Sequence, residues 1–292
     1  MTEYTKPAAT YKEQLDILKS RNLIVDDEDK AIKYLKSVGY FRLNGYWLTL
    51  CSDKDTFCNN TTFEHIIDIY NFDYKLKVII FDLLEIVEVN LRALISHHFA
   101  ISKNPLSHYD VNNFVNKKWY SSWIEEFETQ VAKAKIRKEP FVSHYVNKYD
   151  SIFPIWAALE MTSFGTLSKF YNNLDNVLKN EISKSNYSLQ FEYLANYIYV
   201  FSVVRNMCAH NCRLYDRQLA IIPKLSRKEA PLMNNKYIYS VIYCAGKIIT
   251  DIEKWEDQKK EIKNLVIQFQ GKVDLEKVGF PNDWESLLDS VN

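Results

Sequence analysis

The chain has 292 residues with 37 basic and 37 acidic side chains, so its formal net charge is zero. This balance argues against a protein that coats nucleic acid non-specifically, because such proteins carry an excess of lysine and arginine. Hydrophobic residues make up 47% of the chain, whereas glycine and proline supply only 6 and 7 residues. A large β-protein or a glycine-rich nucleotide fold needs more turn residues than this, so we expect an all-α protein with a full hydrophobic core.

The first part of the chain predicts four elements. Apolar residues at helical spacing predict short helices over residues 11–20 and 27–37. The aromatic stretch between Gly39 and Gly45 predicts a tight loop or a short hairpin. The strongest prediction is a helix over residues 63–100, where the apolar face repeats without a glycine or proline. Its length is compatible with one helix or with two abutting helices.

Prolines separate the later elements from one another. The chain carries no internal repeat and no low-complexity tract. We expect residues 1–60 to form a small N-terminal appendage of helices and loops, and residues 61–292 to form a helical core, as one continuous domain. After residue 100, helical patterns are predicted in this core over 119–137, 141–148, 155–179, 188–219 and 235–270, followed by a turn-rich tail that ends in a helix. The stretch 188–219 is compatible with one long helix or with a pair.

The chain shows no feature of a secreted or membrane protein. Its N-terminus is polar, and no stretch approaches the roughly 18 uninterrupted apolar residues of a membrane span. Its five cysteines are an odd number without a paired framework, which fits a reducing compartment. We therefore expect a cytoplasmic protein that contacts no membrane, holds no metal ion and needs no cofactor.

The most informative segment reads V-V-R-N-M-C-A-H-N-C-R-L-Y-D-R. It places Arg205, Asn206 and His210 within six residues. Arginine binds phosphate through two parallel hydrogen bonds, and histidine transfers protons near neutral pH. In a helix that continued to residue 219, Asn206, His210, Arg213 and Arg217 would lie within about 60° of one another. The segment therefore predicts a polar stripe that contacts phosphate.

These groups suit attack of a ribose 2′-hydroxyl on the adjacent phosphate without a metal ion. His210 would act as general base or acid, Arg205 would stabilise charge on the phosphoryl oxygens, and Asn206 would orient either group. One helix supplies one histidine, so a symmetric dimer would complete the cleft. From spacing alone, the alternative is a surface or interface histidine beside structural arginines.

Seven short sequence blocks, spread along nearly the whole chain, are similar to those of a known protein family. Together they resemble the Abi family of bacterial abortive-infection proteins, the AbiD/AbiF group of the HEPN superfamily. The resemblance implies an all-α HEPN-like bundle and a role in anti-phage defence, commonly as a dimeric, metal-independent ribonuclease with Arg205, Asn206 and His210 as catalytic residues. The blocks are Y-L-K-S-V-G-Y-F-R-L-N-G-Y-W, I-Y-N-F-D-Y-K-L-K, I-V-E-V-N-L-R-A, S-H-Y, F-P-I-W-A-A-L-E-M-T-S-F-G-T-L-S-K-F-Y, V-R-N-M-C-A-H-N-C-R-L-Y-D-R and G-F-P-N-D-W.

The resemblance adds further candidates. Related families often place an acidic residue on the facing helix, and Glu88 is the candidate here with Arg92 as its partner. The spacing of Glu88 and Arg92 also fits an ordinary helix salt bridge. His144 in the central His-Tyr block is either a second catalytic or RNA-contacting histidine or a hydrogen-bonded histidine at a helix junction. One departure lies in the block after the Phe-Asp pair, where family members often carry an arginine and this chain has Tyr74-Lys75-Leu76-Lys77. Positive charge is kept there, but bidentate phosphate binding by arginine is lost.

Three functions follow from these residues. The leading hypothesis is a phage-defence endoribonuclease that cleaves RNA at a composite site of a homodimer. The alternative is a non-catalytic binder of a small structured RNA that regulates defence. In a third hypothesis the motif is a protein–protein interface. The expected partners are accordingly RNA, as substrate or regulator, and a second copy of the chain.

Overall fold

The computed structural model describes residues 7–53 and 55–291, which form thirteen α-helices. Between these residues the only strand-like pairings are two isolated β-bridges. The all-α prediction is therefore confirmed. Residues 1–6 and 54 of the predicted appendage, and residue 292 of the predicted core, lie outside the described residues. In the described part of the chain, no helix is long and apolar enough to span a membrane.

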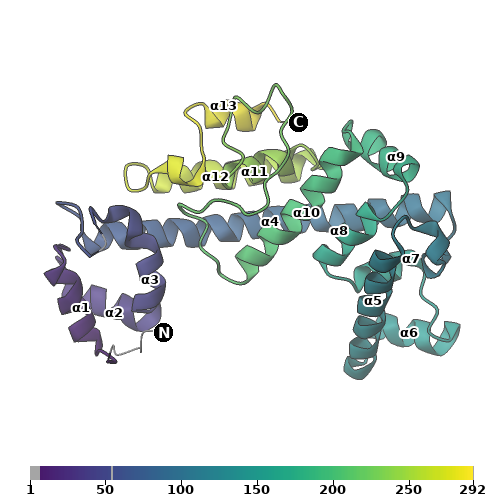
Figure 1. Ribbon diagram of the computed structural model, residues 1–292, viewed down its shortest axis with the longest axis horizontal. Helices are drawn as coiled ribbons and strands as arrows, with labels where there is room; N and C mark the ends of the chain where they lie inside the picture. Colours follow the sequence, from purple (N-terminus) through teal and green to yellow (C-terminus); the bar gives the residue numbers. More distant parts are fainter. Residues whose placement is uncertain (1–6, 54, 292) are drawn as a thin grey trace.

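A single helix, α4 (Phe63–Ser102), runs through the whole molecule (Figure 1). Its 40 residues correspond to a length of about 60 Å. The helix begins where the Thr62 side chain accepts a hydrogen bond from the His65 backbone N–H, and no glycine or proline interrupts it. The prediction over residues 63–100 is confirmed as one continuous helix, which serves as the axis for the remaining elements.

A small group of three helices, α1 (Tyr11–Ser20), α2 (Glu28–Ser37) and α3 (Tyr40–Trp47), lies at one end of α4. The first two confirm the sequence prediction. The loop or hairpin predicted between Gly39 and Gly45 is wrong, because that stretch forms α3. Gly39 adopts a φ of +90°, a conformation that glycine adopts without strain, and so turns the chain directly into the new helix.

A second group of helices surrounds the other end of α4 (Figure 1). The helical pattern predicted over residues 155–179 forms two short helices and the start of a third. The Ser163 and Asp175 side chains accept hydrogen bonds from backbone N–H groups and start new helices inside that stretch. The group comprises α5 (Lys117–Arg137), α6 (Pro140–Tyr149), α7 (Ile155–Glu160), α8 (Phe164–Asn172) and α9 (Asn176–Tyr187).

The middle of α4 is covered by the remaining helices. α10 (Phe191–Ala209) crosses α4 and packs against α8, α9 and α11. The helix predicted over residues 235–270 is divided in two, because the Asp251 side chain caps a new helix within it. These last elements are α11 (Tyr239–Gly246), α12 (Ile252–Gln268) and α13 (Trp284–Asp289).

Candidate functional site

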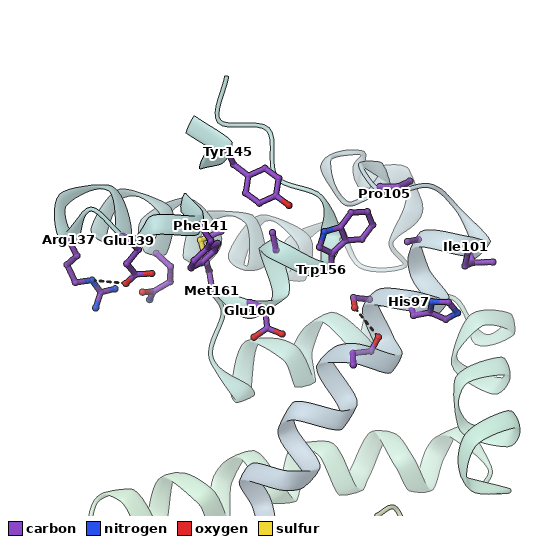
Figure 2. Close-up of a pocket in the computed structure, with 16 residues that line it drawn as sticks. His97, Ile101, Pro105, Arg137, Glu139, Phe141, Tyr145, Trp156, Glu160 and Met161 are labelled. Atoms are coloured by element: carbon purple, nitrogen blue, oxygen red, sulfur yellow. Dashed lines mark hydrogen bonds and ion pairs between the residues drawn. The ribbon is translucent and has the colours of Figure 1, made fainter. Parts of the chain in front are cut away.

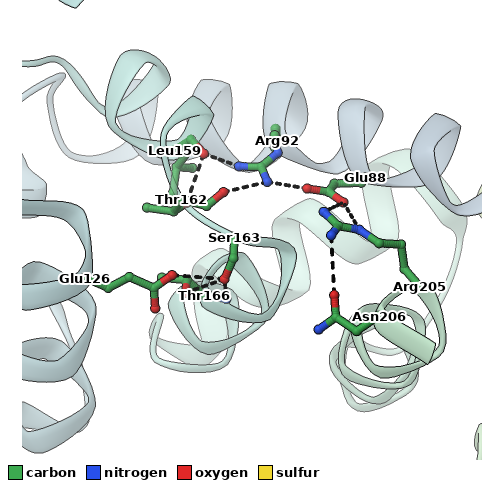
Figure 3. A network of polar contacts seen from close by, with 9 residues as sticks. All are labelled: Glu88, Arg92, Glu126, Leu159, Thr162, Ser163, Thr166, Arg205 and Asn206. Atoms are coloured by element: carbon green, nitrogen blue, oxygen red, sulfur yellow. Dashed lines mark hydrogen bonds and ion pairs between the residues drawn. The ribbon is translucent and has the colours of Figure 1, made fainter. Parts of the chain in front are cut away.

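The crossing of α10 over α4 brings Arg205 against Glu88 (Figure 3). Two N–H groups of the Arg205 guanidinium, Nε–H and Nη2–H, donate to one carboxylate oxygen, Oε2 of Glu88, at 3.2 and 2.8 Å. A third donor, Nη1–H, contacts the amide oxygen of Asn206 at 3.4 Å. The Arg205 side chain is 28% exposed. A guanidinium has five N–H donors, so two of them remain for a ligand.

The other oxygen of Glu88 accepts a hydrogen bond from Arg92, one turn further along α4. Arg92 is buried, and it also donates to the backbone carbonyls of Leu159 and Thr162 at the end of α7. The Leu159 carbonyl also accepts hydrogen bonds from the N–H and the hydroxyl of Thr162, at 3.2 and 2.9 Å. Arg92 therefore fastens α7 to α4, and Glu88 is shared between one buried and one accessible arginine (Figure 3).

The helix that carries the motif ends at Ala209, and residues 211–219 form no helix. The prediction of one long helix or a pair up to residue 219 is therefore wrong after residue 209. Asn211 adopts a left-handed conformation with a φ of +55°. The N–H of Cys212 then donates to the carbonyl of Met207 at 2.8 Å, and the N–H of Asn211 donates to that of Cys208 at 3.0 Å. These are the two bonds of a Schellman motif, which closes a helix.

This ending breaks up the predicted polar stripe. Asn206 and His210 still lie one turn apart, joined by the 2.9 Å bond from the His210 N–H to the Asn206 carbonyl, and both are exposed. Arg213 and Arg217 lie beyond the helix. Arg213 is half-buried and donates to the backbone carbonyl of Gly45 in α3, whereas Arg217 is exposed in the following loop.

Helix α3 contributes a cation that the sequence interpretation missed. Arg42 is exposed, and its Nη1–H donates to the carbonyl of Asn211 at 3.0 Å. It lies directly beside the turn that carries His210. The available signal was its place in the block Y-F-R-L-N-G-Y-W, but the sequence does not show that this block contacts the end of α10.

The segment after α10 is anchored on α4 by Asp73. Its Oδ1 accepts the backbone N–H groups of Leu214 and Tyr215 at 2.8 and 2.7 Å. Its Oδ2 accepts the Tyr46 hydroxyl at 2.7 Å and pairs with the Lys77 ammonium at 3.0 Å. Lys77 is therefore a buried structural cation. The motif is fixed at both ends, by Glu88 at Arg205 and by Asp73 after His210.

The structure does not bring His144 to this site. It is exposed on α6, with its ring beside those of Tyr145 and Tyr149. Figure 1 shows α6 on the arm that holds α5, away from the C-terminal end of α10. The neighbouring Tyr145 lines a different cavity of about 1160 Å³, together with apolar side chains such as Phe141 and Trp156 (Figure 2).

Comparison of the sequence with known protein families tests the resemblance to the Abi family. Residues 33–216 match the family described as Abi-like protein, a span that contains α3, α4, α10 and both anchoring contacts. The chain belongs to the Abi-like protein family. Membership supports a role of this Abi-like protein in abortive infection, a bacterial defence against phage. No curated protein and no solved structure matches the chain.

The remaining chemical groups of the motif are structural. Burial raises the pKa of the Cys208 thiol of this Abi-like protein to about 12, so the thiol stays protonated and packs in the core. Across residues 7–53 and 55–291, no three histidine, cysteine, aspartate or glutamate side chains are grouped as metal ligands would be. The accessible polar groups at the end of α10 are Arg205, Asn206 and His210.

Proposed function

We propose that the protein is a metal-independent endoribonuclease of the HEPN superfamily, acting in phage defence. The observation that carries this proposal is the arrangement at the end of α10. Glu88 fixes the orientation of Arg205 while leaving two of its N–H donors unused, and His210 lies exposed in a turn whose conformation is closed by Asn211. An oriented cation and an accessible imidazole, five residues apart at the end of one helix, are the groups that metal-free phosphodiester cleavage requires.

The reaction proceeds by in-line attack. The phosphate binds the free N–H donors of Arg205, and His210 removes the proton from the adjacent ribose 2′-hydroxyl. The 2′-oxygen forms a bond to phosphorus while the bond from phosphorus to the 5′-oxygen breaks, and a second imidazole donates a proton to that leaving oxygen. The products are a 2′,3′-cyclic phosphate and a 5′-hydroxyl end.

A second copy of the chain supplies the second imidazole. Each copy presents His210 once, at the end of a single helix, so base and acid come from two copies related by a two-fold axis. Asn206, beside Arg205, is placed to bind the same phosphate. Arg42 and Arg217 are exposed near the turn and add positive charge along the path of the RNA.

The test is cleavage of total RNA by the purified protein in the presence of EDTA, with the chemistry of the new ends mapped. We expect 5′-hydroxyl and 2′,3′-cyclic phosphate ends from the wild type and no cleavage by Arg205→Ala or His210→Ala. The matched control is His97→Ala, which removes an exposed histidine of α4 outside the site. Cleavage by a folded His210→Ala protein at the wild-type rate would refute the assignment.

A second function, binding of a small structured RNA without cleavage, is favoured by the engagement of three Arg205 donors within the protein. In that case the remaining N–H donors of Arg205 bind a phosphate of the RNA without stabilising a transition state for its cleavage. Purification with RNA of one discrete length, together with no new RNA ends in any cleavage assay, would select this function over the nuclease.

A further inference from the structure

A cavity of about 720 Å³ lies between α5, α8, α9 and α10, outside the site described above. Its volume falls in the range of roughly 300–1,000 Å³ that small-molecule sites occupy. Four lysines line it, Lys118, Lys169, Lys179 and Lys224, against a single acidic residue, Glu192. The protein as a whole has no net charge, so this excess of positive charge is local and favours an anionic ligand.

One of the four lysines, Lys179, is buried in the wall of the cavity. Its side chain belongs to α9 and is only 9% exposed. Its ammonium lies 4.9 Å from the ring centre of Phe191 and 3.4 Å from the carbonyl oxygen of Asn172, and no carboxylate of the described residues forms an ion pair with it. Burial lowers its pKa. The carboxylates of Asp175 and Glu192 act on its charge without forming an ion pair, so a bound anion would add a direct charge partner.

The cavity also presents aromatic rings. Trp119 of α5 and Tyr199 of α10 line it, and each is 47% exposed. Half-exposed rings beside lysines form the combination that binds single-stranded nucleic acid, because bases stack on the rings and phosphates pair with the ammonium groups.

The exposed face of α10 connects this cavity to the proposed active site. Glu192, Tyr199 and Asn206 are each exposed and follow one another at intervals of seven residues, close to two helical turns. Tyr199 in the cavity and Asn206 in the site are therefore about 10 Å apart along one face of the helix. This distance equals about three stacked nucleotides at roughly 3.4 Å each.

We propose that this cavity binds one nucleotide of single-stranded RNA, with its base on Trp119 or Tyr199 and its phosphate on the lysines. The strand continues from there along α10 to His210. The assignment of the cavity to a nucleotide stands on its lysines and rings. The assignment of the nucleotide to the strand that is cut rests on the proposed function.

The test measures equilibrium binding of a short fluorescein-labelled single-stranded RNA to the full chain with His210→Ala, so that cleavage is not required. The double variant Lys169→Gln/Lys224→Gln removes two exposed lysines of the cavity. We expect it to weaken binding and to reduce the slope of log Kd against log salt concentration by about two. The control is Lys133→Gln/Lys260→Gln, which removes two exposed lysines elsewhere and has the same net charge.

A second variant, Trp119→Ala, separates stacking from charge. Loss of one stacked base weakens binding by about tenfold, with little change in the salt slope. Adenosine monophosphate serves as competitor. If it displaces the RNA at low concentration, the cavity is a nucleotide site that also accepts free nucleotides; if it does not, the cavity requires a strand. Equal binding by the cavity variants and the control would refute the proposal, even if the wild type cleaves RNA.

Discussion

Two arginines that share one carboxylate differ in accessibility. Arg92 is 8% exposed in its side chain and has its donors fixed on Glu88 and on two backbone carbonyls. Arg205 is 28% exposed and retains two donors. At the residue scale, Arg92 therefore stabilises the helix junction, and Arg205 is available to a ligand.

This difference predicts that substitutions at the two arginines destabilise the protein by different amounts. We expect Arg92→Leu to lower the free energy of unfolding by about 3–5 kcal/mol, because it removes the partner of Oε1 of the buried Glu88 and the hydrogen bond to the Thr162 carbonyl. Arg205→Ala should cost about 1 kcal/mol or less, since Arg92 still pairs with Glu88. Urea denaturation of both variants measures the difference, and equal losses would contradict the structural role of Arg92.

A single buried histidine, His108, makes the stability of the protein depend on pH. It is fully buried beside Tyr109, Trp123 and Phe127, and burial lowers its pKa from 6.5 to about 4. Below pH 6.5 the unfolded chain binds a proton that the folded protein does not bind, so stability falls as the pH falls toward 4.

The predicted loss from this histidine is about 2 kcal/mol between pH 7.5 and pH 5. We expect His108→Phe to remove that part of the pH dependence, measured as the urea midpoint at both pH values. His144→Phe, at an exposed histidine in a second Ser-His-Tyr triplet, is the control and should leave the dependence unchanged. A His108→Phe protein with the pH dependence of the wild type would contradict the assignment.

At the scale of single elements, the end of α10 decides where His210 lies. Asn211 holds a left-handed conformation, which is costly for residues with a branched Cβ. We expect Asn211→Gly to be neutral or slightly stabilising. Asn211→Val should lower the free energy of unfolding by about 1–2 kcal/mol and should reduce cleavage, because the turn that carries His210 shifts.

Thermal or urea unfolding and the RNA cleavage assay check this prediction together. Asn180→Val is the control, since Asn180 lies inside α9 and asparagine and valine have similar helix propensities. Unchanged cleavage by Asn211→Val would show that the turn does not position His210.

The same element shows what the sequence could predict. The helices α1, α2, α4 and α5 follow from apolar spacing and from caps that lie next to them in the chain. The end of α10 depends on one asparagine in a left-handed conformation, which a helical apolar pattern does not report. Apart from Lys77 on the same helix, the partners of Asp73 come from α3 and from the segment after α10. No local pattern could identify these partners.

At the scale of the whole molecule, the proposed chemistry depends on a second copy. One chain presents His210 once, at the exposed end of α10, whereas in-line cleavage uses a base and an acid. Arg205, Asn206 and His210 lie on the surface of a single chain, which leaves this site open to a partner copy around a two-fold axis.

A mixing experiment tests this dependence directly. If each active site needs His210 from both copies, a dimer of one wild-type and one His210→Ala chain is inactive. After subunit exchange, an equal amount of His210→Ala should then reduce the activity of a fixed amount of wild type to about half, because half of the wild-type chains pair with the variant. His97→Ala in the same amount should cause no reduction, and a constant wild-type activity in both mixtures would show that each chain cleaves RNA alone.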